Sequence, residues 1–214
     1  IGKPISVNEL NEHETIPEFG EFLRKKTYML SKSFEEKEEE NFKLTFPKFT
    51  SSPKAAKQIV KPANHEQIIE EINFLKEGDY QLLQSKNYRV FLVTAEKIPN
   101  ILHEIGRLRE ITFREVGEGT NEAIDLDKYD QYYHHMFLWD DDAQMIAGAY
   151  RMGFGSKIFP KYGLDGFYLN ELFKFEPELN DMMSQSIEMG RAFIISEYQQ
   201  KPMPLFLLWK GIVH

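Results

Sequence analysis

From residue 88 onward, the spacing of apolar residues alternates between a strand pattern and a helix pattern. Four runs rich in apolar, β-branched or aromatic residues predict strands, at 88–94, 134–139, 144–152 and 187–195. Pro99 opens a helix pattern that runs to about Phe113, and another helix begins near Met203. The order strand, helix, strand, strand, strand, helix predicts an α/β (α+β) fold, with a mixed central sheet flanked by helices.

Two shorter patterns add local detail to this fold. The acidic turn at 140–142 predicts a hairpin between the second and third strands. Upstream, apolar residues from Ile68 to Leu75 recur at helical spacing, with Asn64 placed to cap that helix. The segment 153–186 is aromatic and follows neither period, so its structure is not predicted.

The 214 residues divide into three zones. Residues 1–30 hold an extended start and an amphipathic segment, and residues 31–65 combine an all-charged run with prolines, which predicts a mobile linker. Residues 66–214 carry the pattern of a folded domain. The chain starts with Ile1 and stops at His214 after an apolar stretch, so we expect a fragment truncated at its carboxyl end, or a longer chain with disordered ends.

Composition excludes several classes of function. Cysteine is absent, which rules out a thiolate nucleophile, a disulfide scaffold and a Cys-ligated metal. A net charge of -8 argues against a nucleic-acid partner. No apolar run approaches the roughly 18 residues that a membrane-spanning helix needs.

Arg109 is the most informative single residue by geometry. At about 100° per residue it falls within ~20° of Ile98, in the middle of the apolar stripe of its helix. An unpaired buried charge costs several kcal/mol, so Arg109 predicts a buried carboxylate or an anionic ligand. A purely structural ion pair, or a side chain that reaches solvent from the end of the stripe, is the alternative. On the opposite side of the helix, Glu110 and Arg114 predict an exposed ion pair.

Charged residues also stand on two of the predicted strands. Gly190 interrupts an apolar strand, and a β-bulge there would bring Glu188 and Arg191 to one side and free backbone N–H groups to polarise a carbonyl. An edge strand with two exposed charges is the alternative. Arg151 lies at the end of a predicted strand, on a face with small residues that leaves room for a helix or a ligand. The alternative is that Arg151 is a solvent-exposed strand end.

An acidic cluster, Asp125, Asp127 and Asp130, precedes the second predicted strand. Clustered carboxylates suit a cationic substrate or a metal, but the spacing is not that of an EF-hand, and a solvated loop is the alternative. The adjacent His134 and His135 face opposite sides of a strand, so we expect structural roles for them and no metal site.

Five stretches together resemble one group of bacterial acyltransferases. They are EIGRLREITFREVGEGT (104–120), DLDKYDQYY (125–133), GAYRMG (148–153), EMGRAFI (188–194) and PLFLLWKGI (204–212). The group is the GNAT-like N-acyltransferase domain of ornithine- and glycine-lipid synthases, often labelled hemolysins, which is similar in reduced form to acyl-homoserine-lactone synthases. The opening IGKPISVNEL resembles the tail of an upstream lysophospholipid acyltransferase domain, here residues 1–30.

The resemblance implies a GNAT-like acyl-CoA N-acyltransferase fold. The activity it implies is transfer of a (3-hydroxy)fatty acyl group from acyl carrier protein, or from acyl-CoA, to the amine of glycine or ornithine. It also implies no permanently bound cofactor, and peripheral attachment to the cytoplasmic face of the inner membrane through the upstream domain. Matched position by position, it assigns catalysis to Glu188 and Arg191, and substrate binding to Arg109, Asp127, Asp130 and Arg151.

One segment departs from the GNAT pattern. Residues 198–204, where a glycine-rich turn would cradle a pyrophosphate, contain no glycine and two prolines. This departure favours a carrier-protein donor, which a basic patch could dock, with candidates Arg107, Arg114, Lys201 and Lys210. Two other classes stay open: a non-catalytic module that docks a carrier protein or membrane partner, and a membrane-active hemolysin.

Overall fold

The computed structural model describes residues 15–32 and 55–214. The chain divides into two compact units, residues 1–50 and 51–214. In the first unit the described residues form helix α2, Ile16–Lys32. The domain boundaries expected near residues 30 and 65 stay predictions. Within the described ranges, no helix is long and apolar enough to cross a membrane.

The second unit contains all the other elements that the structure describes. In chain order they are α3 (His65–Glu77), β1 (Gln81–Ser85), β2 (Tyr88–Thr94), α4 (Pro99–Glu115), β3 (His134–Asp140), β4 (Met145–Phe154), α5 (Gly155–Tyr162), α6 (Asn180–Gln185), β5 (Ile187–Ile194), α7 (Ser196–Gln199) and α8 (Pro202–Ile212). Short 3-10 turns connect them, including η2 (Lys128–Gln131), η3 (Gly163–Gly166) and η4 (Tyr168–Glu171).

The predicted strands and helices of this unit are confirmed, and so is the α/β class. The strands form one sheet in the order β1-β2-β3-β4-β5. A mixed sheet was expected, whereas each described pairing is antiparallel. The difference arises because each strand starts at the end of the sheet where the preceding strand stops. The sequence did not predict β1, which is short and half polar.

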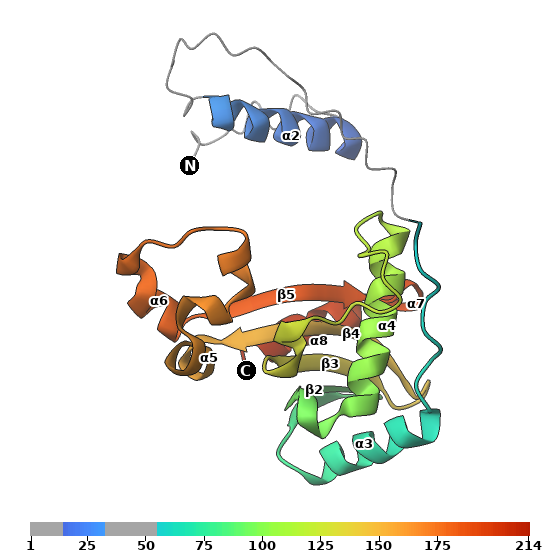
Figure 1. Ribbon diagram of the computed structural model, residues 1–214. Helices are drawn as coiled ribbons and strands as arrows, with labels where there is room; N and C mark the ends of the chain where they lie inside the picture. Colours follow the sequence, from blue (N-terminus) through green and yellow to red (C-terminus); the bar gives the residue numbers. More distant parts are fainter. Residues whose placement is uncertain (1–14, 33–54) are drawn as a thin grey trace. The chain divides into compact units, whose positions relative to one another are not determined.

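Helices cover both faces of the sheet (Figure 1). Helices α3 and α4 lie on one face and α8 lies on the other. The side chain of Asn64 accepts a hydrogen bond from the backbone N–H of Glu66, which confirms the predicted cap of α3. One continuous core joins the layers and includes Trp139 and the contacting rings of Phe91 and Phe137.

Strands β4 and β5 approach each other closely at Gly148. A Cβ added there would lie 2.6 Å from the carbonyl oxygen of Phe193, which belongs to the backbone and cannot rotate away. We expect Gly148→Ala to lower the free energy of unfolding by about 1–3 kcal/mol. Gly190→Ala on the paired strand is the matched control, because a Cβ there meets no atom within 4 Å. Equal denaturation midpoints for the two variants would contradict the close approach.

Candidate functional site

Arg109 of α4 lies in a buried ion-pair network. Its side chain is 1% exposed, and its guanidinium donates to both carboxylate oxygens of Asp130, at 3.1 and 2.9 Å. Its Nε lies 3.1 Å from Oδ2 of Asp125, and Nη2 donates to the carbonyl oxygen of Asp125. The predicted buried carboxylate is therefore confirmed, and two carboxylates fill this role.

The segment after α4 folds back over the helix and seals this network. Gly106 lets the segment approach, because a Cβ there would lie 2.6 Å from the side chain of Leu126. Glu110 accepts hydrogen bonds from the backbone N–H and hydroxyl of Thr120, at 3.0 and 2.7 Å. The expected exposed pair of Glu110 and Arg114 does form, but Glu110 is completely buried, so its exposure was wrongly predicted.

The acidic cluster caps the η2 turn. The carboxylate of Asp127 accepts from the backbone N–H of Tyr129 at 2.8 Å, and Asp130 accepts in return from the backbone N–H of Asp127 at 2.8 Å. Asp125 and Asp130 are almost fully buried, so the solvated-loop alternative is wrong. Burial alone would raise the pKa of Asp130, but the hydrogen bond and charge of Arg109 hold that pKa below its usual value.

Arg151 of β4 joins the same network from the sheet. Its guanidinium donates to Asp127 at 2.6 Å and to Asp130 at 3.2 Å, and the side chain is 2% exposed. The rings of Tyr129, Tyr133 and Tyr168 lie within 5.6 Å of its guanidinium carbon. The alternative that Arg151 is a solvent-exposed strand end is therefore wrong, because the η2 turn and the segment after β4 cover this end of the strand.

His135 is a structural residue in this network. Its Nε2 lies 2.8 Å from the carbonyl oxygen of Asp130, and burial lowers the pKa of the imidazole to about 4. The neutral ring thus supports the η2 turn, which agrees with the structural role that the sequence predicted for His135. In the described part of the chain, no three His, Asp or Glu side chains are arranged as ligands of a metal ion.

A β-bulge interrupts β5 beside this network. Ala149 pairs with Phe193 and Arg151 pairs with Gly190, so both Arg191 and Ala192 lie opposite Tyr150. The predicted bulge is confirmed, one residue after Gly190. Arg191 adopts the left-handed conformation at the bulge, with a φ of 51°.

Glu188 stands on β5 before the bulge and is held by three donors. Its carboxylate accepts from the Tyr133 hydroxyl at 2.5 Å and from the backbone N–H groups of Tyr168 and Leu169, at 3.1 and 3.0 Å. Burial, and then the carboxylate of Glu188, raise the pKa of Tyr133, which keeps the phenol protonated as a donor. Glu188 thereby fixes the start of η4 against β5.

A small polar pocket of about 140 Å³ lies beside the bulge. Glu188 and Arg191 both line this pocket. Strand β5 is the edge strand of the sheet, as the alternative held, but Glu188 is buried and Arg191 is half-buried, so the two charges are not exposed. The pocket is lined by Tyr133, Arg151, Tyr168, Leu169, Glu188, Met189, Gly190 and Arg191.

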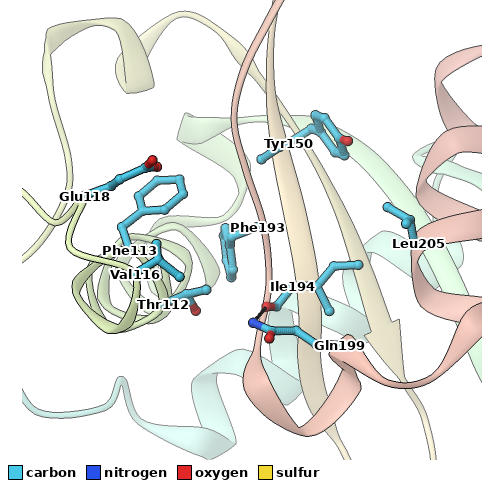
Figure 2. A pocket seen from close by; sticks show the side chains of 10 residues that line it. Thr112, Phe113, Val116, Glu118, Tyr150, Phe193, Ile194, Gln199 and Leu205 are labelled. Carbon is cyan, nitrogen blue, oxygen red and sulfur yellow. Dashed lines mark hydrogen bonds between the residues drawn. The ribbon is translucent and has the colours of Figure 1, made fainter. Parts of the chain in front are cut away.

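A larger apolar groove of about 300 Å³ lies on the other side of the bulge. Figure 2 shows its side chains on both sides of β5, with Thr112, Phe113 and Val116 on one side and Leu205 of α8 on the other. Residues 192–194 of β5 line the groove, whereas residues 188–191 line the polar pocket. The bulge therefore stands where an apolar chain and a charged group could meet.

Comparison with known protein families gives a match that covers part of the chain. Residues 108–209 match the acetyltransferase (GNAT) domain family. This segment is similar to a GNAT domain. The GNAT-like fold expected from the sequence is thus confirmed, and both the bulged strand and the apolar groove lie within the matched segment.

Two homologues are named glycine N(alpha)-acyltransferase. The protein from Bacteroides thetaiotaomicron is 32% identical over 147 residues, which cover 66% of this chain and 43% of the relative. The protein from Phocaeicola vulgatus is 31% identical over 147 residues, which cover 66% of this chain and 44% of the relative. The matched region thus spans less than half the length of these relatives. No solved structure matches the chain.

The structure also reveals residues that the resemblance does not assign to the site. Asp125 belongs to the acidic cluster and pairs with both Arg109 and Arg191. Tyr133 and Tyr168 form walls of the polar pocket. Tyr133 is one of three tyrosines within residues 129–133, directly beside the acidic cluster, and this position was a signal in the sequence. Tyr168 had no such signal, because it lies in the segment 153–186, whose structure the sequence did not predict.

Proposed function

We propose that this domain is an N-acyltransferase that moves a fatty acyl group from a thioester to the amine of a small amino acid, with glycine as the preferred acceptor. The observation that carries this proposal is the bulged strand β5, which lines the apolar groove on one side of the bulge and the polar pocket on the other. An acyl chain in the groove and an amino acid in the pocket would meet at the bulge. The names of the two relatives support the reaction and the acceptor.

The reaction requires no covalent enzyme intermediate. The amine nitrogen attacks the thioester carbonyl carbon, the carbon–sulfur bond breaks, and the thiolate leaves and takes up the proton that the amine loses. Backbone N–H groups near the bulge at Arg191 and Ala192 stabilise the oxyanion of the tetrahedral intermediate. Glu188 lines the pocket and is the candidate acceptor of that proton, directly or through a water; the alternative is that it only positions the η4 turn.

The volume of the polar pocket favours a small acceptor. About 140 Å³ corresponds to roughly five water molecules at ~30 Å³ each. Tyr168, Leu169 and Glu188 bound the pocket, and hydrogen bonds from the two backbone N–H groups hold the Glu188 carboxylate in place. Glycine suits this volume better than ornithine.

The donor in this proposal is an acyl carrier protein, and the product is an amino-acid lipid made at the cytoplasmic face of the inner membrane. Of the basic residues considered for docking, Arg107 and Arg114 already pair with Glu104 and Glu110. Lys201 and Lys210, at the start and near the end of α8, are exposed. An acidic carrier protein that docks on α8 would bring its acyl chain to the groove, which Leu205 lines.

Mass spectrometry of reaction products tests the proposal. The intact protein is incubated with 3-hydroxyacyl carrier protein or acyl-CoA, and with glycine or ornithine. We expect N-acylglycine from the carrier-protein donor. A folded protein that binds the carrier but acylates neither amine would instead be a docking module.

The groove supports a prediction about acyl-chain length. Val116 lines the groove and its side chain is 66% exposed, so Val116→Trp narrows the groove at little cost to the fold. We expect kcat/KM for a long-chain donor to fall by roughly tenfold, about 1.4 kcal/mol, and to fall less for a short-chain donor. Val213→Trp is the matched control, because Val213 is 82% exposed and does not line the groove. Unchanged chain-length preference in Val116→Trp would place the acyl chain elsewhere.

A further inference from the structure

We propose that Arg191 binds the α-carboxylate of the acceptor amino acid in the polar pocket. This inference rests on the proposed N-acyltransferase function and gives it a residue that recognises the acceptor. Among the arginines, the resemblance assigned substrate binding to Arg109 and Arg151. The contacts of the three arginines decide between them.

Arg109 and Arg151 already form close ion pairs with carboxylates of the protein itself. Arg109 is 1% exposed, does not line the pocket, and donates to both oxygens of Asp130. Arg151 lines the pocket, but it is 2% exposed and bound by an aspartate at 2.6 Å. If a ligand replaced the pair of Arg109, the buried Asp130 would lose its closest partner, and a ligand on Arg151 would have to displace the contact with Asp127.

Arg191 is the least neutralised of the three. Its contacts with Asp125 and Asp127 are long, at 3.4 and 3.8 Å, and its side chain is 24% exposed. Its Nε is buried and has no hydrogen-bond partner. Because the contacts of its outer nitrogens are long, a carboxylate in the pocket can accept hydrogen bonds from them, since a guanidinium can donate two parallel hydrogen bonds to one carboxylate.

The backbone at Arg191 points to the same role. A residue other than glycine in the left-handed region is strained, and such strain is concentrated at ligand sites. The neighbouring Gly190 could adopt this conformation freely, yet the chain places Arg191 there. The conformation directs the residue to the pocket, where its guanidinium lies 5.7 Å from the centre of the Tyr168 ring.

The test compares an acceptor that has a carboxylate with one that lacks it. Steady-state kinetics with glycine and with glycinamide are measured for the wild type, Arg191→Ala and Arg191→Lys. We expect Arg191→Ala to lower kcat/KM for glycine by roughly 10- to 100-fold, mainly through KM, and to leave glycinamide nearly unchanged. Arg191→Lys should recover part of the glycine activity, because it keeps the charge but not the two-pronged geometry.

The control is Arg89→Ala, an arginine that pairs with Asp141 on the far side of the sheet from β5 in strand order. Equal losses for glycine and glycinamide in Arg191→Ala would overturn the inference, because a general role at the bulge affects both amines. Glycine binding measured by calorimetry separates the two proposals. Binding that depends on Arg191 without turnover would overturn the proposed function alone, and no glycine binding to the wild type would overturn the inference.

Discussion

Arg109→Met is expected to destabilise the domain by about 3–5 kcal/mol, the usual cost of removing one partner from a buried ion pair. The substitution leaves Asp125 and Asp130 buried beside an apolar side chain, and Arg151 can neutralise only one of them closely. The free energy of unfolding from urea denaturation measures this loss. A loss of this size equals a large part of the free energy of unfolding of many domains.

Arg107→Met is the matched control for stability. Arg107 stands on the same helix and pairs with Glu104, but its side chain is 16% exposed and the pair borders solvent. We expect a loss of about 1 kcal/mol or less from this variant. A loss of similar size in Arg109→Met would contradict the buried network.

The cost of Arg109→Met should also depend on pH. In the wild type the pKa of Asp130 is held below its usual value, so its contribution to stability is present above pH 3.8 and is lost as the pH falls through the folded-state pKa. Without Arg109, burial raises the pKa of Asp130 above that of the unfolded chain. The variant therefore regains relative stability on acidification, and the difference between variant and wild type should shrink from pH 7 to pH 4.

The central residue of the site could be predicted from the sequence. Helical periodicity alone placed Arg109 among core residues, and the cost of an unpaired buried charge then required a carboxylate partner. The bulge in β5 was predictable too, because Gly190 interrupts an otherwise apolar strand. Both predictions depend on local geometry and on a single strong energetic rule.

The burial of Arg151 and Glu110 could not be predicted in the same way. Each side chain lies on a face of its helix or strand that would be exposed if that element stood alone. A segment from another part of the chain covers that face. The η2 turn reaches Arg151, and Thr120 reaches Glu110. These tertiary contacts leave no local pattern in the sequence. The polar pocket depends on a further tertiary contact of this kind, because Tyr168 belongs to the segment 153–186, whose structure was not predicted.

Glu188→Gln is expected to lower kcat/KM by roughly 10- to 100-fold, because a hydrogen bond to a charged group contributes about 1.5–3 kcal/mol. Both oxygens of Glu188 accept from backbone N–H groups, of Tyr168 and Leu169. A glutamine offers one oxygen and one NH₂ group, so one of these N–H groups would face a donor. The variant should therefore loosen the η4 turn at the wall of the pocket. Glu188→Asp is the matched variant, since it keeps the charge and shortens the reach.

The melting temperature, measured beside kcat/KM, distinguishes the two roles that Glu188 can have. If Glu188 accepts the proton of the amine, kcat/KM falls in Glu188→Gln with little change in the melting temperature. If Glu188 only positions the turn, kcat/KM and the melting temperature fall together. The three hydrogen bonds to its carboxylate leave a general base few free lone pairs, so we expect the second result. Near-normal turnover in Glu188→Gln would remove both roles, and the proton would then have to pass directly to a water in the pocket.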